Sequence, residues 1–202
     1  MKPWRYLIAV LYMLSSCVFA EVNFDSPYNQ AQQNFRQGQY YLALDDLKTS
    51  QQLASTTEQK AKSIGLLGLT HYRMHHYQQA ESFLQEAIRT QAGEKSSRAQ
   101  WHIALAALNG SQNQPDSALQ HYQEAMQLAD NNPDLQISIQ LGQVQLKPSN
   151  QRLAELQSIF KKINSLNPPD ARIPHLINIA VQTRSLINSA TSASHSESRT
   201  SS

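Results

Sequence analysis

Three histidines near the middle of the chain are the residues whose spacing comes closest to that of a metal site. His71 and His75 stand four residues apart, a spacing that places two side chains on one face of a helix, and His76 follows directly. The glutamate that follows the first histidine in zinc hydrolases is missing, since Tyr72 holds that position. The surrounding pattern places no carboxylate or further histidine to complete a ligand set. We therefore interpret these histidines as structural or surface residues and predict neither a metal nor another cofactor.

Other signatures of catalysis are missing from the sequence. It contains no Gly-x-Ser-x-Gly nucleophile motif, no phosphate-binding loop and no dinucleotide fingerprint. The adjacent carboxylates Asp45 and Asp46 belong to a predicted helix whose packing stripe is Ala43, Leu47 and Ser50, so we expect water to surround them. The chain is predicted not to be an enzyme.

Small residues recur where a second helix would have to approach closely. An alanine stands near the start of a predicted helix at intervals of 36 to 38 residues, and such a period is typical of a helical repeat. These alanines are Ala43, Ala80, Ala118 and Ala154. In the first three units a bulky residue follows after four positions and a small one after seven, on the same helical stripe. The bulky residues are Leu47, Leu84 and Tyr122, and the small ones are Ser50, Ala87 and Ala125.

The preceding helix of each unit supplies a further small residue 12 positions before the alanine. The pairs at this point are Gln30-Ala31, Leu67-Gly68, Leu105-Ala106 and Leu141-Gly142. A glycine within a helix costs about 1 kcal/mol relative to alanine, so we expect Gly68 and Gly142 to lie where a side chain would separate two backbones. Gly38 is predicted to end a helix, and Tyr77 to begin one.

These features predict an all-α chain, and the segment 61–94 resembles the tetratricopeptide repeat. The resemblance implies a right-handed superhelical array of helix-turn-helix units at about 27–54, 57–91, 95–130 and 134–166, closed by a cap helix at 170–188. The last unit departs from the pattern, with Ser158 and Lys161 where a bulky and a small residue are expected. The predicted helices are 27–37, 40–54, 57–74, 77–91, 95–110, 115–130, 134–146, 150–165 and 170–188.

The resemblance also implies a concave groove, formed by the first helix of each unit, that binds a protein or peptide. Its groove-facing positions correspond to Tyr28, Gln32, Phe35, Lys62, Leu69, Tyr72, Arg73, Gln100, Gln140, Gln143 and Lys147. Amide and aromatic groups of this kind can hold an extended or helical segment. The positions that clamp a terminal carboxylate in some family members hold Gly65 and Leu69 here, so no such clamp is expected.

The first 20 residues have the layout of an export signal, with a basic head, an apolar stretch and a small residue at Ala20. Its removal takes Lys2 and Arg5 and leaves equal numbers of basic and acidic residues, which argues against nucleic-acid binding. The only cysteine, Cys17, also stands in a lipobox-like context, so a lipid anchor is the alternative to a soluble exported chain. We expect a bacterial periplasmic protein, with an outer-membrane lipoprotein or a secreted protein as alternatives.

The segments flanking the array are predicted to be an extended lead at 21–26 and a disordered Ser/Thr-rich tail at 189–202. Two functions fit the sequence. The first is an exported adaptor that binds a protein segment in assembly or secretion at the cell envelope. The alternative is a structural module that self-associates through the apolar helix at 170–188, or an anchored component of a larger complex.

Overall fold

A computed structural model describes residues 23–164 and 172–200. The predicted export signal, with Cys17, lies outside these residues. The described part of the chain is all-α and contains no strand. Its helices are α2 Asp25–Arg36, α3 Tyr40–Leu53, α4 Thr57–Arg73, α5 Tyr77–Arg89, α6 Lys95–Ser111, α7 Pro115–Ala129, α8 Pro133–Gln145, α9 Ser149–Ile163 and α10 Arg172–Thr200. Apart from the end of α10, each bound lies within two residues of its prediction.

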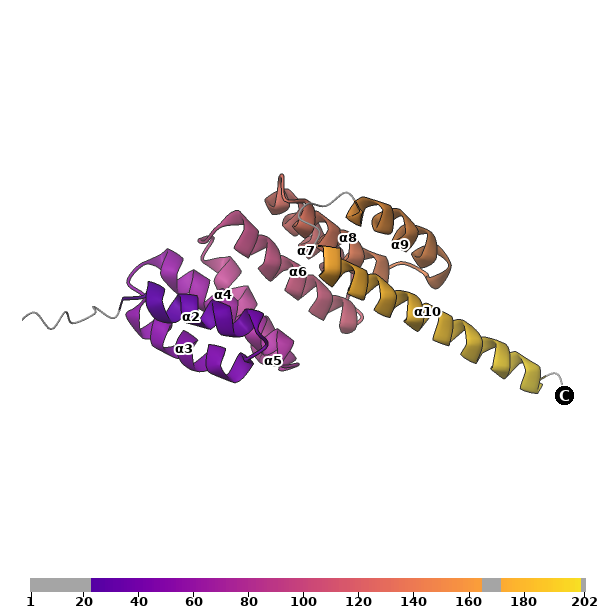
Figure 1. The fold of residues 1–202 in the computed structure, drawn as a ribbon, viewed down its shortest axis with the longest axis horizontal. Helices are drawn as coiled ribbons and strands as arrows, with labels where there is room; N and C mark the ends of the chain where they lie inside the picture. Colours follow the sequence, from indigo (N-terminus) through magenta and orange to yellow (C-terminus); the bar gives the residue numbers. More distant parts are fainter. Residues whose placement is uncertain (1–22, 165–171, 201–202) are drawn as a thin grey trace, which may run out of the picture.

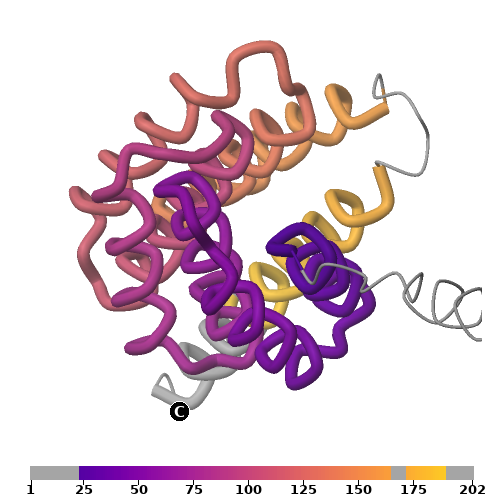
Figure 2. Tube along the Cα trace, turned by 90° about the vertical axis from the view of Figure 1, so that its left-hand side faces the viewer, coloured from indigo at the N-terminus to yellow at the C-terminus, as the bar shows by residue number. Residues whose placement is uncertain are grey.

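Consecutive helices pack against one another in chain order (Figure 1). The closest packing is within the pairs α2/α3, α4/α5 and α6/α7, while α8/α9 is looser. The first helices of successive pairs also touch directly, from α2 to α4, α6, α8 and α10. Viewed along the long axis, the helices follow one another around a curve (Figure 2). The chain is therefore a curved helical-repeat array.

The turn inside each of the first three pairs has the same backbone geometry. The second residue after the first helix has a positive φ, namely 74° at Gly38, 62° at His75 and 57° at Asn113. This conformation is costly for most residues but free for glycine and tolerated by asparagine and histidine. His75 is thus part of the turn that reverses the chain between α4 and α5. The turn, rather than a helix face, determines where its ring lies.

Helix starts follow the local signals in the sequence. Thr56 forms a reciprocal capping box with Gln59 at the start of α4. Asn132 accepts a hydrogen bond from the Leu135 amide at 3.2 Å, and Pro133 then occupies the first turn of α8, where its missing amide hydrogen has no consequence. These caps separate one pair from the next, so the pairing of helices is already encoded locally.

The core is a series of small clusters between neighbouring helices. Ala43, Ala80 and Ala118 have no exposed surface. A Cβ atom added to Gly68 would lie 2.7 Å from Leu84 Cγ, which shows how closely α4 and α5 approach. Leu67, Ala87, Leu105, Ala106, Tyr122 and Ala125 are all buried as well. Tyr77, by contrast, is exposed, and its hydroxyl lies 2.7 Å from His75 Nδ1.

The fourth pair does not follow the predicted register. Ala154 is exposed, and the buried stripe of α9 is Leu156, Ile159 and Ile163. In each of the first three pairs, the small anchor is the fourth residue of the pair's second helix. In α9 the fourth residue is Arg152. Its side chain folds back and donates to the carbonyl oxygens of Lys147 at 2.7 Å and Gln145 at 2.9 Å.

Gly142 is likewise shifted by two positions from its predicted contact with the second helix of its own pair. It lies against the previous pair, where an added Cβ would come within 2.1 Å of the Tyr122 hydroxyl in α7. The period between the third and fourth anchors is consequently 34 residues, from Ala118 to Arg152. An apolar stripe with Leu and Ile on α9 outweighs a lone alanine in setting which face is buried.

Both flanking segments also differ from their predictions. α2 begins at Asp25 inside the predicted extended lead, because Asn23 Oδ1 accepts a hydrogen bond from the Ser26 amide and starts the first turn. The backbone of α10 is helical through Thr200, where a disordered tail was predicted. After Pro174 the segment contains neither glycine nor proline, so no residue interrupts the helix.

Candidate functional site

The inner layer of the curved array is formed by the first helices. Direct contacts join α2, α4, α6, α8 and α10 in sequence, whereas no comparable contact joins the second helices of the described pairs. Elements on the inside of a curve lie closer together than those on the outside, so the first helices line the concave side. All predicted groove residues belong to these helices except Lys147, which lies in the turn after α8.

Aromatic residues at the N-terminal end of this layer are partly used for packing. The Tyr28 ring stacks on Phe24 with centroids 5.1 Å apart, and Gln32 Nε2 donates to the Tyr28 hydroxyl at 3.3 Å. Burial raises the pKa of Tyr28. Phe35 packs against the cluster that contains Ala31. Gln32 also borders a shallow polar hollow of about 460 Å³ on α2. At this end Tyr28 and Phe35 are half-buried, and amide side chains line the hollow.

Lys62 and Tyr72 lie in the middle of the inner layer, on α4. Lys62 Nζ lies 3.0 Å from a Glu58 carboxylate oxygen and 3.3 Å from one of Glu94, which joins α4 to the start of α6. The hydrogen bond that Lys62 donates to Glu58, opposed by burial and assisted by Glu94, raises the pKa of Lys62. Tyr72 packs beside the cluster between α4, α5 and α6, and burial raises the pKa of its hydroxyl.

The other predicted groove residues in the middle of the inner layer differ in exposure. Leu69 is half-buried against the same cluster as Tyr72. Arg73 and Gln100 are exposed, on α4 and α6 respectively. These two side chains can therefore be changed without disturbing the core.

The predicted residues of the fourth pair are gathered into one polar pocket. Gln140, Gln143 and Lys147 line a cavity of about 220 Å³ together with residues of α9. Lys147 forms an ion pair with Glu155, and Lys162 Nζ donates to Gln140 Oε1 at 3.1 Å. The structure thus brings these three residues together, but between α8 and α9 and not in one cluster with Tyr28 and Tyr72.

The predicted histidine pair is divided by the turn. His71 Nδ1 lies 3.3 Å from His76 Nδ1, and His71 stacks on Phe83, while His75 contacts Tyr77. Burial, followed by the neighbouring His76, lowers the pKa of His71. No group of three or more potential metal-binding side chains occurs in residues 23–164 and 172–200.

A second histidine pair was not recognised in the sequence. His102 Nδ1 of α6 lies 3.1 Å from His121 Nδ1 of α7. Burial, with smaller effects from His121 and the nearby Arg98, lowers the pKa of His102 to about 4. Arg98 Nε is buried without a hydrogen-bond partner in the described structure. Only the packing of α6 on α7 brings residues 19 positions apart together, so spacing carried no signal for this pair.

No family model, curated protein or solved structure matches the chain. None of the described helices is long and apolar enough to cross a membrane.

Proposed function

We propose that this chain is an exported, non-enzymatic scaffold of tetratricopeptide type that binds a segment of another protein along its first-helix layer. The observation that carries the proposal is the continuous contact of α2, α4, α6, α8 and α10, which gives one curved face built from successive repeats. Such arrays commonly use their concave surface to hold extended or helical segments. The right-handed superhelix and the bacterial periplasm belong to the same proposal.

The chemistry of the inner layer fits a polar peptide better than an apolar one. Among the predicted groove residues, the exposed ones are an amide and a cation, Gln100 and Arg73, and the aromatic ring of Tyr72 is half-buried. Amides can donate to and accept from a peptide backbone, and the rings add contact area with little loss of conformational freedom. Lys62 is engaged by two carboxylates, so its part in binding is to keep α4 and α6 in register.

The binding face can be tested by site-specific photo-crosslinking in cells. A crosslinking amino acid placed at Gln100 or Arg73 should capture a partner, and mass spectrometry should identify the captured segment. The matched control places it at Gln123 on α7, which is also exposed but lies on the outer layer. Capture at Gln123 alone, or at both faces alike, would contradict the assignment.

A synthetic peptide of the captured segment gives the quantitative test. The double variant Arg73→Ala/Gln100→Ala should weaken its binding by at least about tenfold, equivalent to 1.4 kcal/mol. The outer-layer double variant Gln85→Ala/Gln123→Ala should bind as the unmodified chain does. Mass spectrometry of the N-terminus of the exported protein distinguishes cleavage after Ala20 from lipidation at Cys17.

A further inference from the structure

The fourth pair carries two large polar residues at positions where the other pairs have small ones. Arg152 stands at the anchor, and Gln140 stands 12 residues before it. The residues equivalent to Gln140 in the first three pairs are Ala31, Gly68 and Ala106, all of them buried. Small residues let two helices approach closely, whereas larger side chains at the contact increase the distance between their axes. The looser packing of α9 on α8 follows from these two exchanges and leaves space between the helices.

Two polar stripes line this space and form the pocket of about 220 Å³. Each stripe has the spacing of three and then four residues that places side chains on one helix face. The stripes are Gln140, Gln143 and Lys147 on α8 and the turn after it, and Glu155, Ser158 and Lys162 on α9. The buried side chains of Val144 and Ile159 complete the lining, while Ser158 and Lys162 are exposed to solvent. The pocket is therefore polar and accessible.

The contacts inside the pocket indicate which ligand it suits. Lys147 is paired with Glu155, and Arg152 fixes the turn that carries Lys147 by donating to its carbonyl oxygen. Lys162 Nζ donates to the neutral oxygen Oε1 of Gln140 at 3.1 Å. Two ammonium groups and one carboxylate leave the lining with an excess of positive charge. A hydrogen bond from an ammonium group to a carboxylate is roughly twice as strong as one between neutral groups, so an added carboxylate is the favoured ligand.

The distribution of charge along the chain points the same way. Residues 23–134 contain 11 acidic and 8 basic residues, whereas residues 135–164 contain 4 basic residues and only Glu155 as an acid. The cations are thus concentrated around the fourth pair. A local excess of one charge attracts a partner of the opposite charge and raises its rate of association.

We propose that the α8/α9 pocket binds the side-chain carboxylate of an aspartate or glutamate in the partner segment. Lys162 Nζ supplies the cation, and the Gln143 amide and the Ser158 hydroxyl supply further donors. The source of this carboxylate rests on the proposed function, because α8 belongs to the first-helix layer along which the segment binds. The partner is accordingly an acidic segment, with its acidic residue at the fourth pair.

Nuclear magnetic resonance of the full chain tests the site directly. The probe is an acetylated, amidated peptide of alternating glutamate and alanine, in which side chains supply the only carboxylates. Its shifts should concentrate at residues 140–147 and 155–162, and it should bind at least about tenfold more tightly than the same peptide with glutamine. Equal binding of the two peptides overturns the proposal. Inorganic phosphate at the same ionic strength should bind more weakly than the glutamate peptide, and equal affinity would overturn the assignment to a carboxylate.

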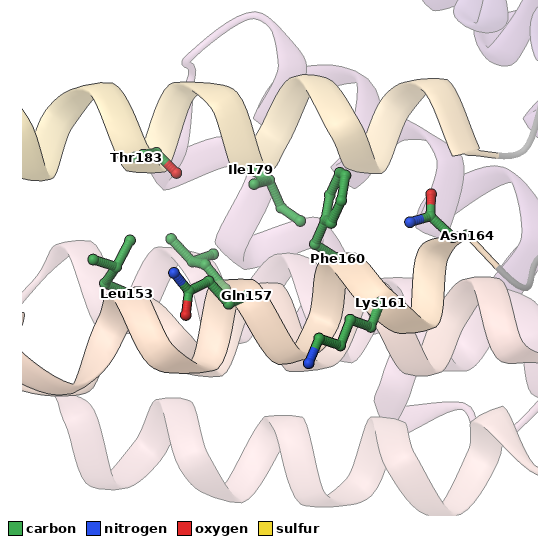
Figure 3. A pocket seen from close by; sticks show the side chains of 8 residues that line it. Leu153, Gln157, Phe160, Lys161, Asn164, Ile179 and Thr183 are labelled. Carbon is green, nitrogen blue, oxygen red and sulfur yellow. The ribbon is translucent and has the colours of Figure 1, made fainter.

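Charge-neutralising variants locate the cation. Lys162→Gln should raise the dissociation constant of the glutamate peptide by at least about fivefold. The matched control Lys161→Gln removes the same charge from the adjacent exposed residue, whose side chain lines a separate hollow between α9 and α10 (Figure 3). It should leave the affinity nearly unchanged. Equal effects of the two variants would reduce the binding to general charge attraction and overturn the site.

Removal of the internal carboxylate should have the opposite effect. Glu155→Gln frees Lys147 and removes a like charge, so it should lower the dissociation constant of the glutamate peptide by at least about threefold. Glu86→Gln, which removes an exposed carboxylate from α5, is the control and should have little effect. A loss of affinity in Glu155→Gln contradicts the proposed arrangement.

The segment captured by crosslinking separates this inference from the proposed function. If Arg73→Ala/Gln100→Ala weakens its binding and Lys162→Gln does not, the pocket inference fails and the scaffold stands. If the glutamate peptide occupies the pocket and no segment is captured at Gln100 or Arg73, the scaffold fails, and with it the partner segment as the source of the carboxylate.

Discussion

Gly65, like Gly142, is a residue at which the array leaves no room for a side chain. A Cβ atom there would lie 2.1 Å from Trp101 Cε2, and the indole is only 2% exposed, so it has nowhere to move. Gly110, in α6, presents a different case, since its added Cβ would lie 3.0 Å from the flexible end of Leu146. Gly65 and Gly110 share a helical environment and differ in the neighbour that a methyl group would meet.

The substitution Gly65→Ala should lower the free energy of unfolding by about 1–3 kcal/mol, because overpacking against Trp101 exceeds the gain in helix propensity. Gly110→Ala should be neutral or stabilising by up to about 1 kcal/mol, since Leu146 can adjust. Urea unfolding of both variants measures the difference. Equal effects would show that helix propensity alone governs these positions.

The contact between α6 and α7 contains the pair His102 and His121, which makes this element pair sensitive to pH. Burial lowers the pKa of both rings, that of His102 to about 4, whereas an unfolded histidine has a pKa near 6.5. Below pH 6.5 the unfolded chain therefore binds more protons than the folded chain. Stability is complete above this pH and decreases as the pH falls towards 4.

The free energy of unfolding should fall between pH 7 and pH 5 by at most about 1.4 kcal/mol per pH unit from His102 alone. The variant His102→Gln should show a shallower dependence, because the amide does not titrate in this range. Thermal unfolding followed by circular dichroism at several pH values measures both slopes. A profile that is the same in the variant would contradict the assignment to this pair.

At the scale of the whole molecule, a local loss of stability should affect only neighbouring pairs of helices. The core consists of separate clusters, one containing Ala31 and Leu47 and another containing Leu141 and Ile159. In a repeat array each unit interacts with its neighbours alone, so a defect at one end should affect the other end little. The curved shape therefore does not require a single cooperative core.

The variants Leu47→Ala and Ile159→Ala test this from opposite ends of the array. Each should cost about 2–5 kcal/mol locally. Hydrogen exchange should show lost protection mainly in α2–α4 for the first variant and mainly in α8–α10 for the second. Uniform loss along the chain in both variants would indicate one cooperative unit.

The helices and the pairs they form could be predicted from local signals in the chain. Caps such as Thr56 and Asn132, and turn residues such as Gly38, act on their immediate neighbours, so their effect is visible in the chain. The spacing of Ala43, Ala80 and Ala118 likewise follows from helix geometry, and all three are buried as predicted.

Features that depend on contacts between distant residues could not be predicted in this way, and the folded structure was needed to find them. It placed Arg152, and not Ala154, at the fourth anchor, because the apolar stripe of α9 had to face α8 and α10. It brought His102 to His121, gathered Gln140 and Lys147 into a pocket apart from the other predicted groove residues, and left one face of α10 open. Spacing along one helix reveals which residues share a face, but the partner of that face is set by packing across the whole array.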